Sequence, residues 1–387
     1  MPHANTRFPG GDKCPILWAI FPLRSSCRQD TLRALLQFNV SFAGFGVGNA
    51  SASATHALLL TVLQDFFGRM TTICGAYLIG PSLTSEAKTF RLLADLLNDI
   101  AIVLDTLSPL LKLSVLRVST LCLSGSLRAM CGLCAGGSKA ALTNHFASPT
   151  SGSGDVGDLN AKDSSKETVL ALLGMLVGSV VVQHLNSAFL TYTVLFTLVG
   201  LHLALNYAGV SGVVLRTLNR QRMTIAWELY RANGRTPTPE EVSSLEHIFQ
   251  RPDHIRGTKC TFGSSLNAVL GGTSIPRSLL DGMGEERYIL WSERGAGVSL
   301  HICFKEGYTP FDQLRSWAHA VEVVGMTSKD PADDKLIISA HQTMAAAFPA
   351  FLDGMREKGW IVADVALQAG QPQALIVAVD FEDRKRR

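Results

Sequence analysis

The chain has 387 residues, a length that suits two domains or one large domain with an appendage. Charged residues make up only 17% of it and hydrophobic residues 47%, which lies at the upper end of the range for soluble proteins. The formal net charge of +3 is close to neutral and gives no reason to expect a nucleic-acid partner.

Residues 1–43 are predicted to form an irregular N-terminal segment. The glycine-rich run Gly44–Asn49 is predicted to be a turn, because no strand precedes it and its spacing is not that of a phosphate-binding loop. A long apolar helix is expected from Ala52 to Leu78. Asp65 and Arg69 lie one turn apart in that helix, in the order that favours an ion pair. In lipid, such a pair must face protein or water.

The next predicted helix, Glu86–Leu107, carries an ionisable stripe. At ~100° per residue its polar residues fall within an arc of about 120°, and aliphatic residues cover the remainder. The stripe consists of Lys88, Arg91, Asp95, Asn98, Asp99 and Asp105. Two interpretations stay open: a solvated face of an amphipathic helix, or a polar interior enclosed by other helices.

A further helix is expected over Ser114–Phe146, where Gly132 and Gly136 have the spacing of a close helix–helix contact. Cys131 and Cys134 form a CxxC pair in the same helix. No second pair lies at zinc-ligand spacing, so the sequence identifies neither a metal site nor a cofactor. The eight cysteines suit a reducing compartment better than a disulfide framework.

From Thr168 to Leu215 the chain contains no Asp, Glu, Lys or Arg. This stretch has room for two membrane spans of roughly 20 residues each, divided by a polar break at Leu185–Ser187. A helical hairpin in a membrane would place both basic flanks on one side. The alternative is a pair of buried helices in a soluble bundle. The charged residues before the stretch are Asp158, Lys162, Asp163, Lys166 and Glu167.

The pattern changes after Arg222. Residues 223–285 are expected to be a helical and flexible linker, and residues 286–387 a small α+β domain of order ββααββ. Its predicted elements are strands 288–291 and 298–304, helices from Thr309 and over 336–358, and strands 360–367 and 374–379. The fold expected for the whole chain is therefore a mainly α membrane helical bundle over residues 44–222, followed by this C-terminal domain.

Several segments in this order resemble the ROOT UV-B SENSITIVE (RUS) family, across about residues 44–222. They are Gly44–Thr55, Asp65–Arg69, Ser85–Lys88, Arg91–Asp99, Leu107–Pro109, Ala135–His145, Asp158–Thr168 and Leu218–Arg222. The C-terminal α+β stretch also fits the plan of that family. The resemblance implies a membrane-associated protein without an established enzymatic activity, whose plant relatives are linked to UV-B response and vitamin B6 homeostasis and act as interacting pairs.

Three functions are therefore considered. The first is an integral, multi-pass membrane protein that binds or passes a small solute at a polar site. The residues of that site would be Asp65, Arg69, Lys88, Arg91, Asp95, Asn98 and Asp99, with Asp158, Lys162, Asp163 and Glu167 at its mouth. Intramembrane ionisable residues are candidates for such a role.

The second function is a non-catalytic membrane scaffold that recruits a partner through its C-terminal domain. The third, an enzyme, has the least support, because Lys88, Lys139 and Lys162 lack the context of a Schiff-base lysine. The expected partners are the lipid bilayer and a family-type protein partner or a second copy of the chain. Neither the solute nor the organelle follows from the sequence.

Overall fold

The computed structural model describes residues 54–147, 154–270, 276–294, 298–327, 333–362, 367 and 372–376. The predicted segment 1–43 and the Gly44–Asn49 turn lie outside these residues. The chain divides into two compact units. The helical unit comprises the chain up to Leu78 together with Phe90–Gly212, and the α/β unit comprises Ile79–Thr89 and Val213–Arg387.

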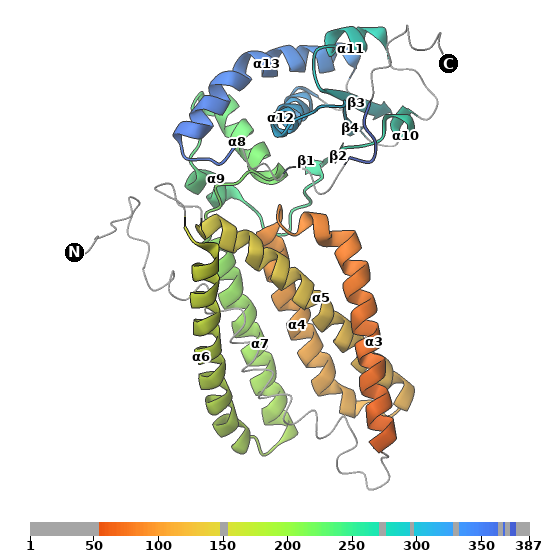
Figure 1. Cartoon of the computed structure of the whole chain (residues 1–387), viewed down its shortest axis with the longest axis vertical. Helices are drawn as coiled ribbons and strands as arrows, with labels where there is room; N and C mark the ends of the chain where they lie inside the picture. Colours follow the sequence, from red (N-terminus) through yellow and green to blue (C-terminus); the bar gives the residue numbers. More distant parts are fainter. Residues whose placement is uncertain are drawn as a thin grey trace, which may run out of the picture. The chain divides into compact units, whose positions relative to one another are not determined.

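Long helices form the helical unit (Figure 1). They are α3 (Ala54–Ile79), α4 (Ala87–Leu107), α5 (Ser114–Ala147), α6 (Val156–Gln183) and α7 (Ala188–Ser211). Short 3-10 turns at Gly80–Ser82 and Ser108–Leu110 each have proline at their start, where the missing N–H of proline costs no hydrogen bond. The helices expected around these positions are confirmed.

The uncharged stretch forms a helical hairpin, as predicted. Helix α6 ends at Gln183, and Ser187 begins α7 by accepting a hydrogen bond from the backbone N–H of Leu190 at 3.2 Å. Within the described residues α5, α6 and α7 are long and apolar enough to cross a membrane. Only 11% of the most apolar window of α6, and of α7, is buried in the protein, so most of their apolar surface faces outward.

Helix α3 contacts α5 at glycines other than those predicted. A Cβ at Gly125 would lie 3.4 Å from the backbone oxygen of Gln64, whose side chain donates a hydrogen bond to the Leu121 carbonyl. A Cβ at Gly132 or Gly136 would meet no described atom within 4 Å. The prediction that Gly132 and Gly136 mediate close packing was wrong, because α3 crosses α5 at Gly125 instead.

The α/β unit contains the remaining elements (Figure 1). Its helices are α8 (Arg220–Asn233), α9 (Pro239–Leu245), α10 (Leu266–Leu270), α11 (Arg277–Gly282), α12 (Pro310–Met326) and α13 (Asp334–Glu357). Its strands are β1 (His254–Ile255), β2 (Thr258–Phe262), β3 (Tyr288–Arg294) and β4 (Val298–Phe304). The β3–β4 hairpin and the helices α12 and α13 lie where the sequence predicted them.

The described strands form one sheet in the order β1-β2-β4-β3. Strand β2 runs parallel to β4, with Cys260 opposite Leu300, and β3 runs antiparallel to β4, with Leu290 opposite Ile302. The prediction of a helical and flexible linker over residues 223–285 did not include β1 and β2. Their backbone hydrogen bonds to the hairpin make them part of the same sheet, which is therefore not confined to residues 286–387.

The two last predicted strands are not found as regular strands among the described residues. Ile361 forms an isolated bridge with Thr217, and Ile376 forms one with Lys305. Residues 363–366 and 377–379 of those predicted strands lie outside the described part of the chain. The described order is thus ββαα followed by two single bridges, not a complete ββααββ.

One hydrophobic core holds the α/β unit together. Trp227 of α8 packs edge-to-face on Phe351 of α13 with ring centroids 5.0 Å apart, and Trp317 of α12 is completely buried. Helix α12 begins with a capping box in which the Thr309 hydroxyl and the Asp312 carboxylate accept each other's backbone N–H groups. The core fixes α8 and the segment after α9, which carry Arg222 and Glu246.

Candidate functional site

The polar stripe of α4 is buried. Asp95 and Asn98 are each 1% exposed and Asp99 is 2% exposed, and Arg91 is buried beside them. The interpretation of a solvated helix face was therefore wrong, and the interpretation of an enclosed polar interior is confirmed for these four residues. Polar groups in such a place are costly unless they find partners.

Helix α7 supplies partners for Asp99. His202 Nδ1 lies 2.6 Å from Asp99 Oδ2, and Asn206 Nδ2 lies 2.8 Å from His202 Nε2. With the Asn206 amide donating to His202 Nε2, the Nδ1–H of His202 donates to Asp99. Ile102 of α4 and Leu195 of α7 pack together in a buried cluster and hold the two helices in contact.

Several buried polar atoms on this part of α4 have no hydrogen-bond partner among the described residues. Within the described residues, both atoms of the Asn98 amide and one oxygen of each carboxylate, Asp95 Oδ1 and Asp99 Oδ1, make no hydrogen bond. Arg91 Nη2 lies 3.8 Å from Asp95 Oδ1, which is an ion pair without a hydrogen bond. We refer to Arg91, Asp95, Asn98, Asp99, His202 and Asn206 as the α4–α7 cluster.

Helix α5 closes another side of α4. Ser124 donates a hydrogen bond of 3.1 Å to the Ala101 carbonyl, and Arg128 forms an ion pair with Asp105. Asp105 lies ten residues beyond Asp95, about 15 Å along the helix. The sixth residue of the predicted stripe is thus paired separately from the α4–α7 cluster.

Asp65 and Arg69 make no described contact with the α4–α7 cluster. Both side chains are exposed on α3, and among the described residues no ion pair joins them. Their predicted pairing was wrong. Helical spacing allowed the contact but could not show that this face of α3 points outward.

The predicted mouth residues on α6 bind other partners. Asp158 and Lys162 form an exposed pair at 2.6 Å. Lys139 of α5 lies 3.2 Å from Asp163 and 2.9 Å from Glu167. These charges join α6 to α5, and none of the described contacts brings them to the α4–α7 cluster.

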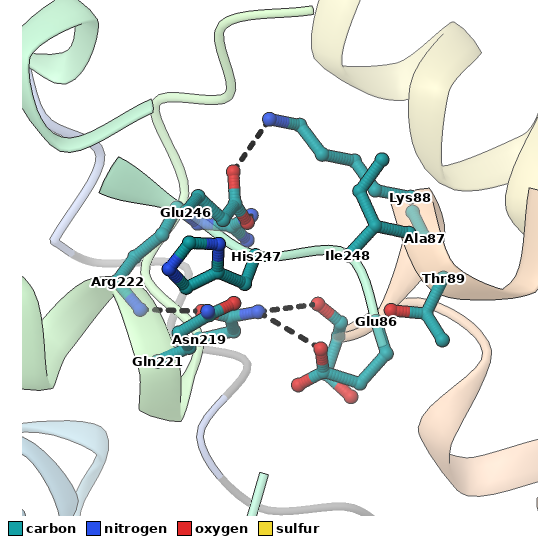
Figure 2. Close-up of a pocket in the computed structure, with 11 residues that line it drawn as sticks. Glu86, Ala87, Lys88, Thr89, Asn219, Gln221, Arg222, Glu246, His247 and Ile248 are labelled. Atoms are coloured by element: carbon teal, nitrogen blue, oxygen red, sulfur yellow. Dashed lines mark hydrogen bonds and ion pairs between the residues drawn. The ribbon is translucent and has the colours of Figure 1, made fainter. Parts of the chain in front are cut away.

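Lys88 belongs to the α/β unit. Its ammonium group lies 2.5 Å from Glu246, and Arg222 lies 2.7 Å from the other oxygen of that carboxylate. Asn219, the N-cap of α8, donates a hydrogen bond of 3.1 Å to Glu86. Figure 2 shows these side chains around one pocket. The predicted stripe therefore divides: Lys88 pairs with Glu246, while Arg91 and the residues after it lie in the helical unit.

The pocket around Lys88 is small. Its space of about 190 Å³, part of it open to solvent, lies below the usual range of about 300–1,000 Å³ for ligand sites. Burial raises the pKa of Glu86 despite the nearby Arg222, and burial lowers the pKa of Lys88 despite the attraction of Glu246. Both pKa shifts have the direction expected when a charged group is desolvated. The arrangement fits a structural ion-pair network better than a ligand site.

Sequence reasoning missed most of the partners. His202 and Asn206 stand one turn apart in an otherwise apolar helix, a spacing that was available as a signal. Glu246 lies in a short segment after α9 and gave no such signal. Within the described residues no three His, Cys, Asp or Glu side chains gather as a metal site would require.

Comparisons with known proteins agree with the resemblance in the sequence. The family model described as "Vitamin B6 photo-protection and homoeostasis domain" matches residues 24–234, and "Root UVB sensitive protein, C-terminal" matches residues 235–371. No solved structure matches the chain.

Three relatives illustrate the similarity. Protein root UVB sensitive 3 of Arabidopsis thaliana is 30% identical over 85% of this chain and 74% of its own length. RUS family member 1 of Dictyostelium discoideum is 34% identical over 56% of this chain, and the match spans only 41% of that protein. Protein root UVB sensitive 2, chloroplastic, of Arabidopsis thaliana is 25% identical over 82% of this chain and 71% of its own length.

The fold defines a mainly helical protein with membrane-length helices and a small C-terminal sheet. The family models and the first relative identify it further, because they cover most of the chain: it belongs to the root UVB sensitive family. The family's descriptions connect it with UV-B sensitivity and vitamin B6, and they name no enzymatic reaction.

Proposed function

We propose that this protein is a non-enzymatic, multi-pass membrane protein that binds or passes a small polar solute at the α4–α7 cluster. The observation that carries the proposal is the burial of Asp95, Asn98 and Asp99 on one face of α4 with hydrogen-bonding atoms left unpartnered. Buried polar groups without partners are costly, and a solute that supplies the missing hydrogen bonds offsets that cost.

The surroundings of the cluster support a membrane location. Helices α5, α6 and α7 have the length and composition of spans, and they expose large apolar residues such as Leu176, Phe189 and Phe196. Apolar surface of this extent is unfavourable in water. An ionisable cluster inside such a bundle is a candidate for solute binding, because isolated charges in lipid are expensive.

The description of the family model supplies the first solutes to examine, namely forms of vitamin B6. A solute that binds the folded protein raises its stability in proportion to the logarithm of solute concentration. The full-length protein purified in detergent is therefore heated with pyridoxine, pyridoxamine or pyridoxal 5′-phosphate. At least one of them should raise the unfolding temperature of the wild-type protein.

The variant Asn98→Leu removes the unpartnered amide and keeps a similar volume, so it should abolish the rise. Glu240→Gln, which alters an exposed carboxylate at the start of α9, is the matched control and should leave the rise intact. The proposal is rejected if no compound shifts the unfolding temperature, or if Asn98→Leu responds like the wild type.

A further inference from the structure

The α4–α7 cluster contains two acidic side chains, Asp95 and Asp99, and one arginine. Arg91 lies 3.8 Å from Asp95, and His202 and Asn206 form a hydrogen-bonded chain that ends at Asp99. Arg128 of α5 is paired with Asp105, further along α4. A buried carboxylate is stabilised by a proton or by a cation, so this group of acidic side chains can accept a monovalent cation in exchange for a proton.

The unpartnered atoms specify the kind of cation. Three side-chain oxygens receive no hydrogen bond from any described group, one from each of Asp95, Asn98 and Asp99. These residues lie at positions i, i+3 and i+4 of α4, so their side chains project from one face of a single turn. A primary ammonium group carries three N–H donors and one positive charge, which matches three acceptor oxygens on two acidic side chains and an amide.

Asn98 is the independent evidence that a ligand belongs there. An acidic pair can be satisfied by Arg91 and His202 alone, but an amide that is 1% exposed and makes no hydrogen bond through either atom has no role in those pairs. Its oxygen can accept from an ammonium group, and its NH₂ can donate to an acceptor elsewhere on the same solute. A transition-metal ion fits less well, because the described residues contain no gathering of three His, Cys, Asp or Glu side chains. A hard alkali ion also binds carboxylate and amide oxygens, and sodium is therefore a control in the experiment.

We propose that the α4–α7 cluster recognises the primary ammonium group of a small solute through Asp95, Asn98 and Asp99. This inference rests on the proposed function and names the chemical class of its ligand. His202 and Asn206 orient Asp99, and Arg91 stands beside Asp95, where it can meet an anionic group on the same solute.

Methylammonium chloride is the probe, because it is the smallest alkyl ammonium with three N–H donors. The unfolding temperature of the full-length protein in detergent is measured against methylammonium, with tetramethylammonium and sodium chloride at equal ionic strength as controls. Tetramethylammonium carries the charge without donors, and sodium carries the charge without directional hydrogen bonds. We expect a saturable rise with methylammonium alone.

The variants Asp95→Asn and Asn98→Leu should each reduce the methylammonium response at least about tenfold in apparent affinity, the loss expected for one charge-assisted hydrogen bond. Glu240→Gln should respond like the wild type. Equal shifts by methylammonium and tetramethylammonium, or no shift by either, overturn the ammonium assignment. An equal shift by sodium also overturns it, in favour of an alkali-ion site.

Failure of this inference is distinguishable from failure of the proposed function. Pyridoxine has no amine. If pyridoxine stabilises the protein through Asn98 while methylammonium does not, the cluster binds a solute of another class and only the ammonium assignment is lost. If no compound of either set stabilises the protein, both proposals are rejected.

Discussion

Asp99 and His202 are 103 residues apart in the sequence, yet a hydrogen bond of 2.6 Å joins them between α4 and α7. Both side chains are almost completely buried, at 3% exposure each. This contact joins α4, which carries the polar stripe, to α7, which has no charged residue. The apolar hairpin therefore packs against the polar stripe. The stripe is thereby enclosed instead of solvated.

Asp99→Leu should impair folding, because it leaves the buried Nδ1 of His202 without its hydrogen-bond partner inside the bundle. Leaving a buried donor unsatisfied costs about 1–3 kcal/mol. The measurement is the unfolding temperature of the purified full-length protein, together with its abundance in membranes. Glu240→Gln is the control. Wild-type stability and abundance in Asp99→Leu would show that the Asp99–His202 contact does not stabilise the folded protein.

Glu246→Gln should destabilise the α/β unit more than Lys88→Met does. Glu246 is the shared partner of two buried cations, so its loss leaves Lys88 and Arg222 both unpaired, at a cost of about 3–5 kcal/mol. Lys88→Met removes one cation and leaves the Glu246–Arg222 pair in place. Urea unfolding followed by tryptophan fluorescence reports on this unit through the buried Trp227 and Trp317. The reverse order of stabilities would refute the assignment of Glu246 as the centre of the network.

The α/β unit should lose stability as the pH falls from about 6.5 to about 3. Burial lowers the pKa of His319 from 6.5 to about 3. Across this pH range the unfolded chain therefore binds a proton at His319 that the folded unit does not bind. The Tyr288 hydroxyl and the Ile337 carbonyl hold the neutral ring at 3.2 and 2.8 Å.

Glu286 acts in the same direction. Burial would raise its pKa, but the hydrogen bond with His341 and the charge of Arg315 outweigh burial and hold the pKa below 4.5. The stabilisation by Glu286 is therefore present above the unfolded-state pKa and is lost as the pH falls through the folded-state pKa. His319→Asn should flatten the dependence of unfolding free energy on pH between about 6 and about 4. An unchanged slope in that variant would contradict the buried neutral histidine.

Gly125→Leu should loosen the contact of α3 with α5, whereas Gly132→Leu on the same helix should be tolerated. A Cβ at Gly125 already lies 3.4 Å from the Gln64 backbone oxygen, and a longer side chain has to displace α3. Overpacking of this kind costs about 1–3 kcal/mol. Unfolding temperatures of the two variants decide the matter. Equal effects at the two glycines would mean that α3 does not pack where the structure places it.

The sequence predicted local features well because helical spacing and charge pattern depend on near neighbours. Most of the α4 stripe, the α6–α7 hairpin and the Thr309 start of α12 follow from such patterns. The partners of the stripe did not, since His202 and Glu246 reach α4 only through the tertiary fold. The spacing of residues along the helix also could not predict that Asp65 is exposed.

Strands β1 and β2 were missed for a related reason. They contain only two and five residues, and β2 is a strand because it pairs in parallel with β4, some 40 residues later. Parallel pairing leaves no turn signal between β2 and β4. The tight antiparallel turn at Arg256 and Gly257 between β1 and β2 was an available signal that was not used. The division of the stripe between Lys88 and Arg91 likewise depends on Glu246, which no local pattern identifies.

We infer that the helical unit lies in a membrane and encloses the α4–α7 cluster there. The decisive experiment is alkaline carbonate extraction of membranes from cells that express the full-length chain, because carbonate releases peripheral proteins and leaves integral ones in the bilayer. We expect the chain to stay in the membrane pellet with a known integral protein. Recovery of the full-length chain in the supernatant, with a known peripheral protein, would rule out the membrane location.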